Sequence, residues 1–129
     1  MTTDLWMLVG ACGLDWALIM TAAVPRLLGR GGLRWGLGNR DEAAPVGAWV
    51  KRADRAHHNL QENLILFAAL VLVVHVAGKT SDLSTLGTEV FFGARLAHAL
   101  IYVAGIPVLR TLAWLTSLVG LAMLVAALV

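Results

Sequence analysis

Four long runs of apolar residues, separated by short polar stretches, dominate the pattern of this chain. The first covers about residues 5–24 and is interrupted by Asp15, and the others cover about residues 60–77, 90–106 and 108–129. Each run is close to the ~20 residues that an α-helix needs to cross about 30 Å of hydrocarbon. The alternation typical of a membrane-spanning β-strand is absent. The pattern therefore predicts four membrane-spanning helices.

The polar stretches indicate where the helices begin and end. Pro45 is suited to open the second helix, and Gly105 with Pro107 marks a tight turn before the fourth. The segment 26–45 is rich in glycine, which disfavours helix, so we expect an irregular loop at the membrane surface. We expect one all-α domain over residues 1–129, with helices at about residues 5–25, 46–78, 84–106 and 108–129.

Composition agrees with a membrane protein. Of the 129 residues, 59% are hydrophobic and 14% are charged, against roughly 25% charged in soluble domains. No Lys or Arg precedes the first apolar run, where a signal peptide carries positive charge, so we expect this run to be a retained helix. Cys12 is the single cysteine, which excludes an intrachain disulfide and a cysteine-based metal cluster.

The basic residues are concentrated between the first and second apolar runs. They are Arg26, Arg30, Arg34, Arg40, Lys51, Arg52 and Arg55. The positive-inside rule therefore predicts that the 26–58 loop is cytoplasmic and that both termini lie on the other side of the membrane. A nucleic-acid patch is the other interpretation of these charges, but contact with anionic lipid headgroups suits a membrane chain better.

Two of the apolar runs carry polar side chains at helical spacing. The residues are Arg55, Asn59 and Glu62 in the second helix and Arg95, His98 and Tyr102 in the third. Intervals of three and four residues place each set on one face of its helix. Polar side chains are costly in hydrocarbon and persist mainly where they pair, line a cavity or bind a ligand. We therefore expect both sets to face a shared interior, either as contacts between helices or as a binding site.

Two charges of opposite sign lie deep in the predicted bundle. At a rise of ~1.5 Å per residue, Asp15 and Arg95 each lie about 15 Å from the cytoplasmic end of their helices. An unpaired buried charge is costly, so we expect these two residues to form an ion pair, or to share Glu62.

Other side chains at the cytoplasmic ends of the helices suit a charged, polar ligand. Arg55 and Arg110 are suited to carboxylates, Glu62 to an ammonium group, and Tyr102 and Thr111 offer hydroxyl groups. A lipophilic co-substrate could then arrive from the bilayer. The four small helices leave little interior, which favours a homo-oligomer.

The histidines do not predict a metal centre. His57 and His58 are adjacent and point in different directions on a helix, and His75 lies near the far end of the same helix. We therefore expect no metal.

Two sequence strings resemble the MAPEG family, the membrane-associated proteins in eicosanoid and glutathione metabolism. They are RAHHNLQENLILFAAL at residues 55–70 and ARLAHALIYVAGIPVLRTLAW at residues 94–114. The patterns RAxxNxxE and RxxHxxxY occur together, in order, in the second and third predicted spans, and the resemblance covers nearly the whole chain. The GNRD string at residues 38–41 is more similar to bacterial members than to animal ones.

The resemblance implies a four-helix protomer that assembles as a homotrimer, with glutathione as a co-substrate bound between subunits and open to the cytoplasm. The residues implied to bind glutathione are Arg55, Asn59, Glu62, His98 and Tyr102. Arg110 would face the sulfur with Thr111 beside it, and Arg26 or Arg30 would supply a further basic residue. The implied partners are membrane lipids and a lipophilic substrate, and the implied location is a bacterial inner membrane.

The resemblance implies a glutathione-dependent transferase or peroxidase. Arg110 would lower the pKa of the glutathione thiol, and the thiolate would attack a lipophilic electrophile or a lipid hydroperoxide. A membrane binding or assembly protein without turnover is one alternative. A small lipid or solute carrier is another, although the chain has no paired inverted repeat.

Overall fold

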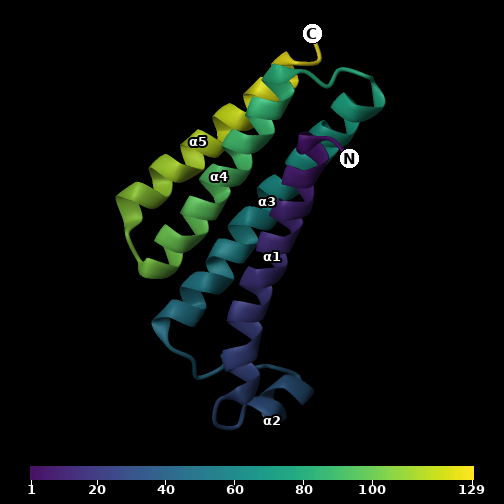
Figure 1. The fold of residues 1–129 in the computed structure, drawn as a ribbon. Helices are drawn as coiled ribbons and strands as arrows, with labels where there is room; N and C mark the ends of the chain where they lie inside the picture. Colours follow the sequence, from purple (N-terminus) through teal and green to yellow (C-terminus); the bar gives the residue numbers. More distant parts are fainter.

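Five helices and no strand make up the regular structure of residues 1–129 in the computed structural model (Figure 1). The helices are α1 (Thr3–Leu28), α2 (Gly32–Leu37), α3 (Ala48–Val76), α4 (Asp82–Ala104) and α5 (Pro107–Ala126). Each end of the four long helices lies within three residues of the position expected from the apolar runs.

The segment between α1 and α3 is not irregular throughout, so the expectation of a loop there was wrong for residues 32–37. Gly31 adopts a left-handed conformation with φ of 72°, which turns the chain back towards α1. A Cβ on Gly32 would lie 2.2 Å from the carbonyl oxygen of Arg26, so only glycine fits this close approach. The glycines that argued against helix therefore make the turn that allows α2 to form.

The long helices pack as two antiparallel pairs (Figure 1). α1 lies beside α3, and α4 forms a hairpin with α5; α4 also contacts α1 and α3, whereas α5 contacts only α3 and α4. Both chain termini lie at one end of the bundle, and α2 lies at the other (Figure 1). This arrangement follows from an even number of long antiparallel helices, which returns the chain to the end at which it began.

Three helices, α1, α3 and α5, are long and apolar enough to cross a membrane by length and composition. α4 has 23 residues but carries Glu89, Arg95 and His98 among its apolar residues. Because α4 packs against each of the other long helices, Arg95 and His98 are buried among protein neighbours, whereas Glu89 is exposed. Many large apolar side chains are exposed on the outside of the bundle, as is typical of helices that contact lipid. The protein is an integral membrane protein in contact with lipid.

The interior consists of two apolar clusters with a polar layer between them. The cluster nearer the termini includes Phe67 and Phe91, whose rings stack with centroids 3.9 Å apart. The second cluster consists of Leu18, Ala56, Leu60 and Ala99. Between the two clusters, α1, α3 and α4 each bury polar side chains: Asp15, Asn63, and Arg95 with His98. This layer borders the candidate site.

Candidate functional site

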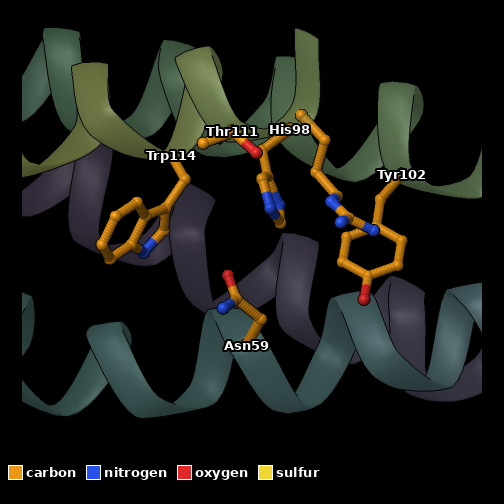
Figure 2. Close-up of a pocket in the computed structure, with 6 residues that line it drawn as sticks. Asn59, His98, Tyr102, Thr111 and Trp114 are labelled. Atoms are coloured by element: carbon orange, nitrogen blue, oxygen red, sulfur yellow. The ribbon is translucent and has the colours of Figure 1, made fainter. Parts of the chain in front are cut away.

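A polar pocket of about 210 Å³ lies between α3, α4 and α5 (Figure 2). The residues that line it are Asn59 from α3, His98 and Tyr102 from α4, and Arg110, Thr111 and Trp114 from α5. Five of these six residues were expected at the site from the sequence. The structure therefore brings together side chains up to 55 positions apart in the chain (Asn59 to Trp114).

The turn between α4 and α5 determines how Arg110 meets Tyr102. Gly105 has a φ of 86° and its backbone N–H donates to the carbonyls of Ile101 and Tyr102, which ends α4. Pro107 then occupies the first turn of α5. Arg110 consequently lies back over the last turn of α4, with its guanidinium carbon 4.5 Å from the centre of the Tyr102 ring.

The pocket is positively charged. The side chain of Arg110 forms no ion pair and no hydrogen bond with the protein, and no carboxylate lines the pocket. The His98 and Tyr102 rings make an edge-to-face contact with centroids 5.4 Å apart. The Thr111 hydroxyl donates to the carbonyl oxygen of Pro107 at 3.2 Å. An anionic ligand would therefore meet a guanidinium without competition from an acidic side chain.

Arg95 supports the pocket from the buried side. It is 1% exposed, and its Nη2 donates to Oδ1 of Asn59 at 2.9 Å. This bond occupies the amide oxygen of Asn59 and leaves its amide nitrogen without a protein partner. The amide nitrogen is thus available to donate to a ligand. Nε and Nη1 of Arg95 are also buried without a hydrogen-bond partner.

The expected pair between Asp15 and Arg95 does not form. Asp15 is buried, and its Oδ1 lies 2.8 Å from Nδ1 of His57 on α3. Glu62 forms no ion pair with either residue. The two deep charges share a level in the bundle, but Asp15 on α1 faces α3, whereas Arg95 on α4 faces Asn59. Similar depth did not decide which neighbour each charge meets.

Two residues expected at the site do not line the polar pocket. Arg55 and Glu62 are exposed on α3. Glu62 lines a separate hollow of about 520 Å³ that also includes Asp15 and Cys12 of α1. Asn59 and Glu62 are three residues apart, which corresponds to a rotation of about 300° around the helix axis. The two side chains therefore point in directions about 60° apart, and the stripe lies at the boundary between the buried and exposed faces of α3. Only its inward member reaches the polar pocket.

The basic residues at the end of α1 also lie outside the pocket. Arg26 forms an ion pair with Asp54 of α3, with Nη2 2.9 Å from Oδ2 and Nη1 3.0 Å from Oδ1. Arg30 is exposed and lines a hollow beside α2. The sequence left Arg26 and Arg30 as alternatives, and neither lines the polar pocket.

The sequence analysis did not include Trp114 in the site or His57 as the partner of Asp15. Trp114 lies four residues after Arg110, one helical turn away, so its spacing placed it on the same face. No comparable signal identified His57, because its role depends on how α1 packs against α3. The structure contains no group of three or more potential metal ligands.

Comparison with known proteins places the chain in a family. The model of the MAPEG family matches residues 5–129, which is essentially the whole chain. No curated protein sequence matches the chain closely enough to indicate a relationship.

Proposed function

Because the chain belongs to the MAPEG family, a membrane family that includes glutathione transferases and peroxidases, we propose that it binds glutathione in the polar pocket and activates its thiol. The observation that carries the proposal is the unpaired guanidinium of Arg110 in a pocket without a carboxylate. A nearby cation stabilises a thiolate and lowers the pKa of the thiol from its usual value of about 8.5.

The residues divide between holding the peptide and activating the sulfur. The amide nitrogen of Asn59 and the ring of His98 are suited to hydrogen bonds with the peptide. Arg110 stabilises the thiolate after the thiol proton has left for water. The Thr111 hydroxyl donates to Pro107, so it must rotate before it can donate to the sulfur. No metal takes part in this chemistry.

The thiolate then acts on a lipophilic molecule from the bilayer. With an electrophilic carbon, its sulfur forms a C–S bond while the leaving group departs with the bonding electrons. With a lipid hydroperoxide, the sulfur attacks oxygen and breaks the O–O bond, giving a lipid alcohol and glutathione sulfenic acid. A second glutathione then reduces the sulfenic acid to give glutathione disulfide and water. Both reactions use the same activated thiolate.

The complete site requires more than one protomer in this proposal. The pocket volume of about 210 Å³ lies below the roughly 300–1,000 Å³ typical of ligand pockets. Arg55 and Glu62 lie outside the pocket and are exposed. A homotrimer in which one subunit presents these two residues to the pocket of the next would supply groups for the remaining carboxylate and ammonium of glutathione.

The proposed orientation places the α2 end of the bundle in the cytoplasm. Seven of the ten basic residues lie in residues 26–55, and the positive-inside rule assigns such a segment to the cytoplasmic side. Glutathione, a cytoplasmic thiol, would then reach the pocket from that side. The inner membrane of a bacterium fits this arrangement.

The decisive experiment is a titration of the detergent-purified protein with glutathione, followed by ultraviolet difference absorbance and calorimetry. We expect a saturable thiolate band in the wild type, its loss in Arg110→Ala, and partial recovery in Arg110→Lys. Lys79→Gln, at the opposite end of the bundle, serves as a control for loss of one charge. Binding without a thiolate band in the wild type would favour a binding protein without turnover. No binding at all would overturn the proposal.

A further inference from the structure

A second pocket, separate from the polar pocket, lies beside α2. It has a volume of about 570 Å³. The side chains that line it include Arg30, Arg34, Trp35, Arg40, Asp41 and Glu42. None of its three arginines, Arg30, Arg34 and Arg40, has a role in the proposed glutathione chemistry. The pocket therefore requires an explanation of its own.

Specific contacts hold the walls of this pocket, which distinguishes it from a loose basic loop. Nε1 of Trp35 donates to the carbonyl oxygen of Glu42 at 2.6 Å, closing residues 35–42 into a ring. Arg40 has a φ of 58° and its Nη2 donates to the carbonyl oxygen of Gly36 at 3.2 Å. Its guanidinium carbon lies 5.2 Å from the centre of the Trp35 ring.

The charges in this pocket favour an anion. Arg30, Arg34 and Arg40 form no ion pair with Asp41, Glu42 or any other acidic residue. Arg30 and Arg34 make no side-chain hydrogen bond at all. Three guanidinium groups therefore have donors that are free to bind a phosphate, for which arginine has a suitable planar geometry.

The surroundings indicate where that phosphate comes from. Leu28 is 81% exposed at the end of α1, and Leu33 and Leu37 of α2 are 68% and 89% exposed. Large leucine side chains next to a membrane span are stable when they lie in the apolar part of the bilayer interface. With the leucines at that depth, the arginines and Trp35 lie at the level of the lipid headgroups.

We propose that the pocket beside α2 binds the phosphate headgroup of an anionic phospholipid, with Arg34 and Arg40 as its principal ligands and Arg30 at its rim. The neighbouring leucines contact the acyl chains of the same lipid. Binding at this site would hold the connection between α1 and α3 against the membrane. It does not depend on the identity of the thiol bound in the polar pocket.

The test is native mass spectrometry of the intact protein in detergent, titrated separately with phosphatidylglycerol and phosphatidylcholine. A basic residue near an anionic membrane contributes about 1 kcal/mol, or about fivefold in affinity. We expect preferential retention of phosphatidylglycerol, and Arg34→Gln to weaken it about fivefold or more. Arg34→Lys should recover part of the affinity. Trp35→Phe removes the indole donor without changing any charge, and should also weaken retention.

The matched control is Lys51→Gln, which removes one exposed positive charge at the same end of the bundle but outside this pocket. We expect it to leave retention unchanged. An equal loss in Arg34→Gln and Lys51→Gln would show diffuse attraction and overturn the proposal. Retention of phosphatidylglycerol by Trp35→Phe at the wild-type level would also overturn the proposal. Displacement of the lipid by an equal concentration of inorganic phosphate would identify a site for a free anion instead.

Discussion

At the scale of single residues, Arg95 shows what a buried charge requires in this bundle. It is 1% exposed, and the only hydrogen-bond partner of its guanidinium is Oδ1 of Asn59 at 2.9 Å. The same bond orients the Asn59 amide towards the polar pocket (Figure 2). The stability of the polar layer and the geometry of the candidate site therefore depend on one side-chain contact.

We expect Asn59→Ala to destabilise the protein by about 2–3 kcal/mol, because it leaves a buried guanidinium without a partner. The double variant Asn59→Ala with Arg95→Met removes that charge as well and should regain most of the loss. Thermal unfolding of both variants and of Arg95→Met completes a double-mutant cycle. Strictly additive effects would show that the two side chains do not interact.

The contact between Asp15 and His57 gives a second prediction at this scale. Asp15→Leu leaves the ring nitrogen of His57 without its partner inside the bundle and should cost about 1–3 kcal/mol in the free energy of unfolding. Asp15→Asn keeps an acceptor at the same place and should cost less. Chemical denaturation in detergent measures both variants. Equal stability of Asp15→Leu and the wild type would show that the contact between Asp15 and His57 does not stabilise the fold.

At the scale of elements, the backbones of α4 and α5 approach each other closely at Gly87 and Gly120. A Cβ on Gly120 would lie 2.6 Å from the carbonyl oxygen of Gly87 and 2.7 Å from the backbone nitrogen of Phe91. Only glycine at this position lets the two backbones come so near. Because α5 also carries Arg110, the same contact influences one wall of the polar pocket.

We expect Gly120→Ala to lower stability by about 1–3 kcal/mol, since the added methyl group forces the two helices apart. Gly13→Ala is the matched control, because no atom lies within 4 Å of the position of its Cβ. That change should be neutral or stabilise by about 0.5–1 kcal/mol, as alanine favours helix over glycine. Similar unfolding midpoints for the two variants would contradict tight packing at Gly120.

The turn between α4 and α5 depends on a contact from α3. Nε of Arg52 donates to the carbonyl oxygen of Val103 at 2.8 Å, and its guanidinium lies against Gly105. Arg52→Gln should therefore loosen the turn that positions Arg110 and weaken glutathione binding, whereas the neighbouring exposed Lys51→Gln should not. Calorimetric titration with glutathione compares the two. Unchanged affinity in Arg52→Gln would mean that Gly105 and Pro107 suffice to set the turn.

At the scale of the whole molecule, the expected site residues lie in separate places on the chain. Asn59, His98, Tyr102 and Arg110 line the polar pocket, whereas Glu62 lines the hollow between α1 and α3. A site shared between subunits would reunite these residues. A site confined to one subunit would leave Glu62 without a role.

Mixed oligomers distinguish these arrangements. Arg110→Ala and Glu62→Gln should each lose glutathione-dependent activity when assembled alone. If neighbouring subunits share the site, co-assembly of the two variants restores about a quarter of the sites in a cyclic trimer, since both intact residues then meet at some interfaces. Mixing after separate assembly is the control. No recovery on co-assembly would confine the site to one protomer.

What the sequence determined is local in origin. The number of long helices and the approximate positions of their ends follow from the length of each apolar run and from turn residues such as Gly105 and Pro107. Spacings of three and four residues identified Asn59, His98 and Tyr102, three of the six residues that line the polar pocket. Arg110 and Thr111 were expected from their place at a helix end and from the family resemblance, and the spacing rule could have added Trp114. The signals lie within one helix and do not depend on its neighbours.

Only the tertiary structure decided which groups meet across helices. Helical spacing shows that Arg55, Asn59 and Glu62 lie near one stripe, but the rotation of α3 in the bundle decides that Asn59 turns inward while the others stay exposed. Distance along each helix predicted that Asp15 and Arg95 lie at the same depth and form a pair. The packing of α1 on α3 instead brings Asp15 into contact with His57. The helix α2 likewise depends on tertiary structure, because it forms where the chain turns back at Gly31 and packs against α1. The physical reason is that periodicity defines the faces of a helix, whereas packing against particular neighbours defines what each face contacts.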